Sequence, residues 1–291
     1  MTLGTDTVGF VGLGSMGGAM TGTLLRGGYA VTGYDPDAER LAAAVELGAT
    51  AADDAADVVA RCPLTLVSLR SSDVFVDVAE NALLGAAGQG AIVVDLGTTE
   101  APETRRLASA FAARGAQLLD VPVSGGPGGS VSGTLHMFAG GDADAFESAR
   151  PVLETLGAEG KVVYCGPSGA GQVVKAVNQL AMGLGLAAYV EAMAFGVRSG
   201  VDPEAILQAV GGTDGFRAQF AGVARNVAAN DSPAFYVKFP ELGYFLREAN
   251  EAGLATPLTT ALFEFLDPAE RITEDNMGRP IPSFWRELMA R

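Results

Sequence analysis

The chain has 291 residues, of which 48% are hydrophobic and 18% are charged, and 39 are glycines. This composition is typical of a globular α/β protein and excludes an intrinsically disordered chain. The net charge of −15 disfavours nucleic acid and anionic membranes as partners, because like charges repel. Any anionic ligand must therefore be held by helix N-termini or by a few local cations.

Metal-ligand and targeting patterns are not found in the sequence. Cys62 and Cys165 have no partner at a ligand spacing, so we expect no metal and two reduced, structural thiols. His136, the single histidine, is expected to be a neutral packed or edge residue. The longest strongly apolar stretch, 176–190, is about 15 residues, shorter than the ~20 of a membrane span. We therefore expect a cytoplasmic protein without membrane association.

The glycine motif GLGSMG at 12–17 lies between a short apolar run at 8–11 and a segment with helical apolar spacing. It predicts a strand, a glycine turn and a helix, the arrangement in which a helix N-terminus binds a dinucleotide pyrophosphate. In this reading Gly12 permits the tight turn, Gly14 admits the pyrophosphate, and Gly17 packs the helix on the strand. The predicted cofactor-binding residues of the motif are Gly12, Leu13, Gly14, Ser15, Met16 and Gly17.

A second predicted strand ends at Asp35, which follows Gly17 by 18 residues. A carboxylate at this distance accepts hydrogen bonds from the adenosine ribose and repels a 2′-phosphate. Arg40 comes five residues later, and no arginine follows Asp35 directly, so NAD is favoured over NADP. The alternative is that the glycines are only turn residues and that Asp35 only caps the next helix.

Five further strand-like segments follow, with helix-like segments between most of them: 64–69, 91–96, 117–123, 134–141 and 161–166. This alternation predicts a Rossmann-type, doubly wound, mainly parallel sheet over 1–165, with room for an antiparallel edge. Ligands of such sheets bind beyond the carboxyl ends of the strands, which makes 69–71, 97–99 and 124–126 candidates for the rim of a site.

After Cys165 the pattern is helical, which predicts an all-α second domain over 166–291 that begins with a long interdomain helix. Lys175, Asn178 and Met182 share one face of that helix. A lysine in an apolar helix is costly unless it is paired or functional, although its ammonium group can also extend to solvent.

Four stretches in the right order resemble the β-hydroxyacid dehydrogenases, the family of 3-hydroxyisobutyrate dehydrogenase and tartronate semialdehyde reductase. They are GLGSMG at 12–17, DLGTTEAP at 95–102, DVPVSGG at 120–126 continuing to GTL at 133–135, and GPSGAGQVVKAVNQ at 166–179. The resemblance covers nearly the whole chain.

The resemblance implies that Lys175 is the catalytic acid/base and that Asn178 orients the substrate. It also implies further contacts: for substrate, Ser124, Gly125, Gly126, Thr98 and Gln179; for cofactor, Leu69, Thr98 and Lys238 in addition to the glycine motif and Asp35. Three positions depart from the family pattern. Gly97 stands in place of a serine and Arg70 in place of a proline, and Lys238 lies two residues before the family's lysine.

These observations predict an NAD-dependent oxidoreductase that interconverts a small 3-hydroxy carboxylate and its semialdehyde or keto form. An imine reductase on the same scaffold is one alternative, against which Lys175 argues, and a catalytically silent dinucleotide-binding protein is another. The glycine- and alanine-rich helix after Lys175 predicts a homodimer or homotetramer. The individual substrate and the physiological direction stay open.

Overall fold

The computed structural model describes residues 7–229 and 241–264. The chain divides into two compact units, Met1–Lys175 and Ala176–Arg291. The first contains a sheet covered by helices and the described part of the second is helical, as the sequence predicts. The division falls within a helix, ten residues beyond the boundary expected at residue 165.

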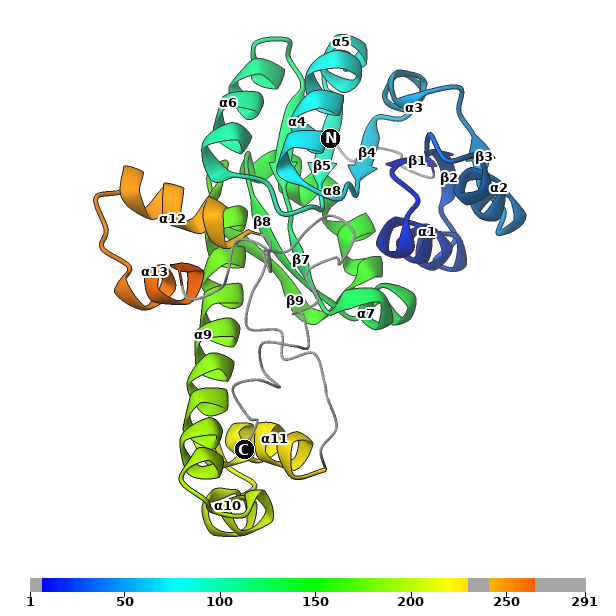
Figure 1. The fold of residues 1–291 in the computed structure, drawn as a ribbon. Coiled ribbons are helices and arrows are strands. Elements are labelled where there is room, and N and C mark those ends of the chain that lie inside the picture. Colours follow the sequence, from blue (N-terminus) through cyan, green and yellow to red (C-terminus); the bar gives the residue numbers. More distant parts are fainter. Residues whose placement is uncertain (1–6, 230–240, 265–291) are drawn as a thin grey trace. The chain divides into compact units, whose positions relative to one another are not determined.

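The sheet of the first unit has the strand order β3-β2-β1-β4-β5-β6-β8-β7, and β9 also pairs with β8 (Figure 1). All pairs among the first six strands are parallel, whereas β8 runs antiparallel to β6 and β7 and parallel to β9. The strands are β1 Thr7–Val11, β2 Ala30–Tyr34, β3 Thr50–Ala51, β4 Leu64–Val67, β5 Ile92–Asp95, β6 Gln117–Asp120, β7 Val123–Ser124, β8 Leu135–Gly140 and β9 Gly157–Gly166. This is the predicted doubly wound sheet with an antiparallel strand toward one side.

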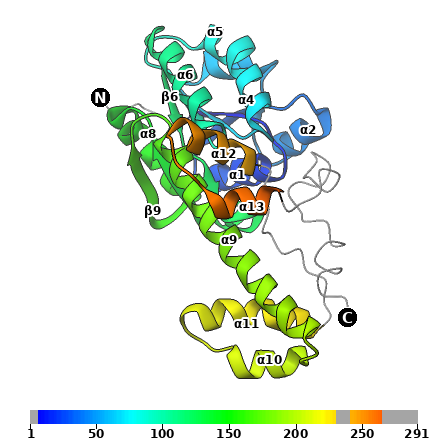
Figure 2. The same cartoon turned by 60° about the vertical axis from the view of Figure 1, so that its left-hand side comes forward.

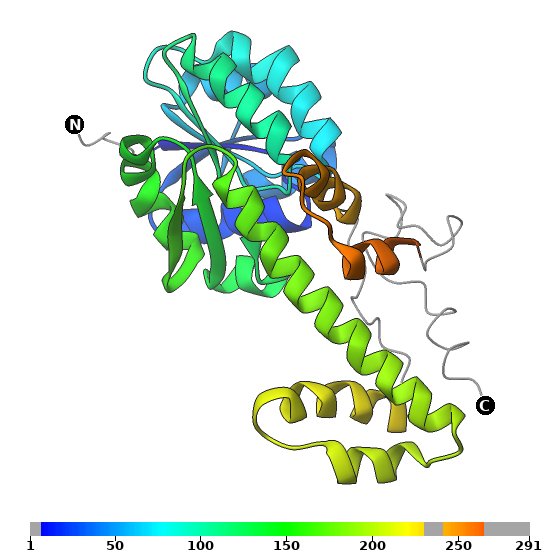
Figure 3. The same ribbon diagram turned by 90° about the vertical axis from the view of Figure 1, so that its left-hand side faces the viewer.

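Helices cover both faces of this sheet, and Figure 3 shows the blue α1 on one face and the cyan helices on the other. They are α1 Ser15–Arg26, α2 Ala38–Glu46, α3 Ala55–Arg61, α4 Ser72–Val78, the π-helical turn Ala79–Leu83, α5 Leu84–Ala86, α6 Ala101–Ala112, α7 Gly126–Ser132 and α8 Ala143–Leu156. Each face has its own hydrophobic core, one with α1, α2 and α8 and the other with α3, α4 and α6.

The alternation of side chains along each strand explains these two cores. In β4, Leu66 belongs to the first core and Val67 to the second, and in β5 Val94 and Val93 divide in the same way. Successive side chains of a strand point to opposite faces, so a strand buried on both faces is mostly apolar, although Thr65 of β4 is a buried polar exception. The continuous apolar runs in the sequence therefore correspond to central strands.

Several strand boundaries differ from the expected ones, and β4, β5 and β8 are each shorter by two residues. The segment expected as one strand at 117–123 is divided into β6 and β7, and Pro122, which has no N–H to donate to a ladder, lies between them. Strand β9 begins at Gly157, four residues earlier than expected, and the two-residue β3 was not expected.

The described part of the second unit is organised by α9 (Ala170–Arg198). Helices α10 (Pro203–Val210) and α11 (Gly215–Ala228) pack on its C-terminal half, and α12 (Leu242–Glu251) and α13 (Pro257–Glu264) on its N-terminal half (Figure 2). These short helices cover part of the apolar surface of α9, whereas Val177, Met182 and Phe195 stay exposed.

Among the described residues, α9 is a helix long and apolar enough to cross a membrane, with a mean hydropathy of 1.6 in its most apolar window. The expected apolar stretch of 176–190 is only part of it. Its first turns, up to Lys175, belong to the first unit and are polar, since Gln172 and Lys175 both make hydrogen bonds within that unit.

Gly17 is required by the packing of α1 on β1, and its replacement tests this contact. A Cβ atom at Gly17 would collide with the carbonyl oxygen of Gly12, which is backbone and must shift. We expect Gly17→Ala to lower the free energy of unfolding by about 1 to 3 kcal/mol in urea titrations. The control is Gly85→Ala in α5, where no atom lies within 4 Å of the new methyl group. Equal stability of the two variants would contradict this account of Gly17.

Candidate active site

The glycine loop between β1 and α1 has the backbone that the motif predicts. Gly12 has a φ of 88°, a conformation that favours glycine, and its N–H donates to the carbonyl of Tyr34 at 2.9 Å. Helix α1 begins at Ser15, with Gly14 as its N-cap residue. The loop is thus closed by backbone contacts, and the helix begins directly after it.

The N-terminus of α1 lacks the side-chain cap that α2, α3 and α8 have. Asp37, Asp54 and Asp142 cap α2, α3 and α8 with their carboxylates, whereas no side chain caps α1 and its first turn contains no acidic residue. The N-terminal N–H groups of a helix carry partial positive charge and favour an anion. An uncapped helix after a glycine turn fits the pyrophosphate of a dinucleotide.

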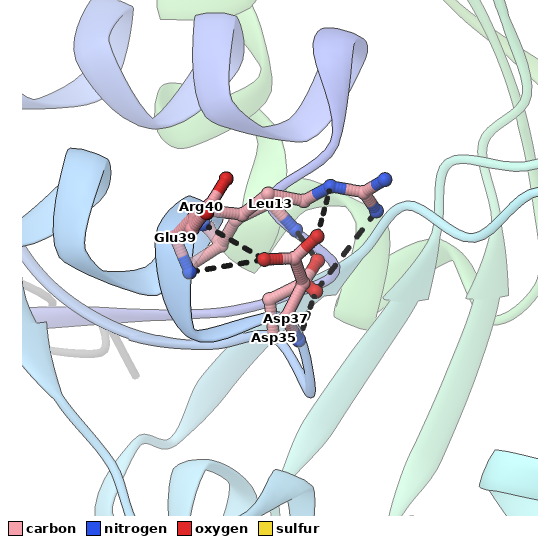
Figure 4. Close-up of polar contacts among 5 residues, drawn as sticks. All are labelled: Leu13, Asp35, Asp37, Glu39 and Arg40. Atoms are coloured by element: carbon pink, nitrogen blue, oxygen red, sulfur yellow. Dashed lines mark hydrogen bonds and ion pairs between the residues drawn. The ribbon is translucent and has the colours of Figure 1, made fainter.

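Asp35, which the sequence places at the ribose, also supports the glycine loop (Figure 4). One carboxylate oxygen accepts the N–H of Leu13 at 2.7 Å and the other accepts the N–H of Asp37 at 2.9 Å. The side chain is buried. A carboxylate has about four acceptor positions, so these two bonds leave capacity for ribose hydroxyl groups.

Arg40 lies closer to this carboxylate than its separation in sequence indicated. Its guanidinium is 4.0 Å from Asp35 and 3.3 Å from Asp37, and a Cβ atom at Gly14 would lie 3.9 Å from it (Figure 4). Because α2 begins at Ala38, its first turn brings Arg40 back toward the glycine loop. A cation is therefore available beside the carboxylate that was expected to exclude a 2′-phosphate.

Two buried carboxylates, Asp95 and Asp120, end the neighbouring strands β5 and β6 and are partners in the parallel register. Asp95 accepts the Thr99 hydroxyl at 2.6 Å and the N–H of Gly97 at 2.9 Å. Burial raises the pKa of Asp95 to about 7, and the charge of Asp120 adds to the rise while these hydrogen bonds oppose it. The loop 97–99 is thus fixed by Asp95.

Asp120 makes the corresponding contacts with α9. It accepts the N–H of Gly169 at 2.8 Å and that of Gln172 at 3.0 Å. Burial raises the pKa of Asp120 to about 6, against the opposing effect of these backbone hydrogen bonds. The Gln172 side chain extends the contact, since its Nε2 donates to the carbonyl of Gly97 at 3.0 Å.

Lys175 reaches the loop that the sequence assigns to the substrate. Its Nζ donates to the carbonyl of Val123 at 2.7 Å, and the lysine is only 7% exposed. Ser124 follows directly, and then Gly125 and Gly126 with φ values of 135° and 60°, which favour glycine at both positions. The structure thus brings the predicted acid/base and the predicted carboxylate-binding loop together.

The remaining predicted residues are placed as follows. Asn178 and Gln179 lie on α9 in the second unit, where the Asn178 amide donates to the Gln179 side chain at 3.1 Å. Leu69 and Thr98 follow the carboxyl ends of β4 and β5, both half-buried. Lys238 lies outside the described residues.

Asp95, Asp120 and Gln172 were not predicted as site residues, although all three lie in the motifs that resemble the family. The available signal was an acidic residue at the end of a fully apolar strand, which is costly to bury without a purpose. His136 is exposed on β8 and is the register partner of Ser124, which sets it beside the same loop. Within the described residues, no cluster of His, Cys, Asp and Glu could hold a metal ion.

Comparison with known proteins identifies the family. Residues 7–166 match the model of the NAD binding domain of 6-phosphogluconate dehydrogenase, and residues 169–277 match that of the NAD-binding domain of NADP-dependent 3-hydroxyisobutyrate dehydrogenase. The chain is 36% identical over 265 residues to 3-hydroxyisobutyrate dehydrogenase of Pseudomonas aeruginosa, covering 86% of this chain and 88% of that protein.

Solved structures agree with this assignment. The fold matches 3-hydroxyisobutyrate dehydrogenase of Mycobacterium tuberculosis with L-serine, at a TM-score of 0.79 and 25% identity over 96% of this chain and 98% of that one. An imine reductase of Streptomyces aurantiacus shares the fold at a TM-score of 0.63 and 23% identity, covering 98% of this chain and 100% of that one. The chain belongs to the β-hydroxyacid dehydrogenase family, and it is an NAD(P)-dependent 3-hydroxyacid dehydrogenase.

The raised pKa of Asp95 has a measurable consequence for stability. Because the folded state holds the proton more tightly than the unfolded chain, the stabilising effect is complete below about pH 4 and is lost as the pH rises through about 7. We expect the free energy of unfolding of the wild type, minus that of Asp95→Asn, to fall by more than about 1 kcal/mol between pH 5 and pH 8. Urea titrations at several pH values measure this difference. A difference that is constant or grows with pH would contradict the assignment.

Proposed function

We propose that the protein oxidises a small 3-hydroxy carboxylate with NAD, or reduces the corresponding semialdehyde or keto acid with NADH, and that Lys175 is the general acid/base. One observation carries this proposal: the buried Lys175 Nζ lies 2.7 Å from the Val123 carbonyl, at the start of the Ser124–Gly126 loop. Lys175 thereby stands next to backbone N–H groups suited to a carboxylate.

The bound nicotinamide supplies a hydride acceptor or donor for the substrate carbon. On the protein side, the uncapped N-terminus of α1 and the glycine loop would hold the pyrophosphate, and Asp35 would accept the ribose hydroxyl groups. Leu69 and Thr98, which follow the carboxyl ends of two central strands, complete the proposed cofactor contacts, and Lys238 is a further proposed contact.

The substrate carboxylate would be bound by Ser124, Gly125 and Gly126. The positive φ values of the two glycines turn successive backbone groups into a short concave loop, and such loops bind anions without a net charge. Thr98, Asn178 and Gln179 are the further proposed substrate contacts. The names of the relatives point to the same substrate class, because 3-hydroxyisobutyrate and L-serine are both carboxylates with a hydroxyl group on the third carbon.

The role proposed for Lys175 follows from its surroundings. In its neutral form the amine can take the proton of the substrate hydroxyl as the carbon is oxidised. In the reverse direction the ammonium group returns a proton to the carbonyl oxygen. Asn178 lies one turn further along α9 and is uncharged at all pH values, so it can orient the hydroxyl group without competing for the proton.

Two further properties belong to the proposal. The alanine- and glycine-rich part of α9 supports a homodimer or homotetramer. The proposed nicotinamide cofactor supports a cytoplasmic enzyme.

Replacement of Lys175 tests the proposed chemistry. We expect Lys175→Met to lower kcat by more than about 100-fold on the best of a panel of 3-hydroxy carboxylates, with little change in NADH affinity. The readouts are nicotinamide absorbance for turnover and fluorescence titration for cofactor binding. The matched control is Lys161→Met, which removes an exposed lysine from β9. Turnover of Lys175→Met at the wild-type rate, or turnover of cyclic imines in preference to hydroxy acids, would overturn the proposal.

Cofactor choice is tested at Asp35. We expect wild type to prefer NAD, and Asp35→Asn to lower the ratio of kcat/KM for NAD to that for NADP by about tenfold or more. The physical reason is that the variant removes the negative charge while Arg40 stays in reach of a 2′-phosphate. Asp37→Asn is the control, because it makes the same charge change at the more exposed carboxylate that pairs with Arg40. Equal ratios in the two variants, or a wild-type preference for NADP, would contradict this role.

A further inference from the structure

The first turn of α9 is capped from a distance. The carboxylate of Asp120, at the end of β6, accepts the N–H groups of Gly169 and Gln172 at 2.8 and 3.0 Å, across about 50 residues of sequence. Asp142, by contrast, caps α8 from the adjacent position in the chain. A local cap satisfies the end of a helix, whereas a cap from a neighbouring strand also fixes where the helix begins relative to the sheet.

Two glycines make room for this contact. A Cβ atom at Gly140 would lie 2.7 Å from both carboxylate oxygens of Asp120. A Cβ atom at Gly171 would lie 2.5 Å from the Asp120 carbonyl oxygen and 2.9 Å from its carboxylate. Real Cβ atoms do not approach so closely, so α9 and β8 meet Asp120 at distances that only glycine permits.

The residues after Asp120 form the second attachment of α9. Val123 follows three residues later, and its carbonyl accepts the hydrogen bond from Lys175 Nζ. The segment 120–123 therefore holds α9 at two points, through its first turn and through Lys175. A third tie runs from the Gln172 side chain to the Gly97 carbonyl, in the loop that leads to Thr98.

We propose that Asp120 is a positioning residue that fixes the first turn of α9, so that the Lys175 ammonium meets the substrate loop, and that Gln172 assists it. This inference rests on the proposed function of Lys175. A proton is transferred only over hydrogen-bond distance, and a displacement of about 1 Å at the reacting group costs up to about 100-fold in rate. By fixing the start of α9, the contact with Asp120 thus controls the rate of proton transfer by Lys175.

The principal test compares Asp120→Asn with Asp142→Asn in the full-length enzyme. Both variants make the same chemical change at a carboxylate that caps a helix, but α8 carries no proposed site residue. We expect Asp120→Asn to lower kcat by about tenfold or more, with a less than about threefold change in NADH affinity, and to shift the pH profile of kcat. Asp142→Asn is expected to leave kcat and its pH profile unchanged. Equal kcat values for the two variants, per folded molecule, would overturn the proposal.

Lys175→Met, measured in parallel, separates the two hypotheses. If kcat falls in Lys175→Met but is the same in Asp120→Asn as in Asp142→Asn, the positioning role of Asp120 is refuted and the proposed function is not. A Lys175→Met as fast as wild type refutes the proposed function, and with it the positioning of Lys175 by Asp120.

Gln172→Met keeps the positioning role testable if Asp120→Asn does not fold. The variant retains the backbone N–H that donates to Asp120, and its side chain has nearly the same length. The Gln172 Oε1 atom is buried without a hydrogen-bond partner among the described residues, so its loss removes no bond seen there. Because the hydrogen bond from the Gln172 side chain to Gly97 is lost, we expect kcat to fall by about threefold or more at unchanged NADH affinity. Wild-type kcat in this variant would contradict the role given to Gln172.

Discussion

The burial of two carboxylates at the carboxyl ends of β5 and β6 is the constraint on which the rest of the site depends. Asp95 and Asp120 are 1% and 0% exposed and stand next to each other in a parallel register. Burying even one charge costs several kcal/mol unless hydrogen bonds compensate for the lost water. The required donors come from Thr99 and Gly97 for one carboxylate and from Gly169 and Gln172 for the other. Because the buried carboxylates accept these hydrogen bonds, they hold the loop after β5 and the start of α9 in place.

The negative charge of the chain and its anionic ligands are reconciled by backbone groups. With a net charge of −15, a cofactor pyrophosphate and a substrate carboxylate are both repelled at long range. In the proposed site, the uncapped N-terminus of α1 and the turn at Gly125 and Gly126 would present N–H groups to these two anions. Arg40 adds local positive charge. Specific short-range donors thus compensate for an unfavourable global field.

The parts of the fold that depend on local patterns were predictable from the sequence. Continuous apolar runs predict strands buried on both faces, and the glycine loop with Asp35 predicts the first βαβ unit, which the structure contains. Contacts between distant segments were not predictable. The bond from Asp35 to the N–H of Leu13, the return of Arg40 to the glycine loop and the donation by Gln172 to Gly97 all depend on tertiary placement. The catalytic role of Lys175 was predicted from the resemblance to a family. Its position in the helix alone fitted a lysine that extends to solvent equally well.

Helix α9 belongs to both compact units, and this explains how the proposed catalytic groups keep their spacing. The division falls between Lys175 and Ala176, so Lys175 is held by the first unit through Val123, whereas Asn178 belongs to the second. Residues three apart on a helix lie on one face, about 5–6 Å apart at their Cβ atoms. The helix itself therefore sets the distance between the proposed proton-transfer group and the proposed orienting amide.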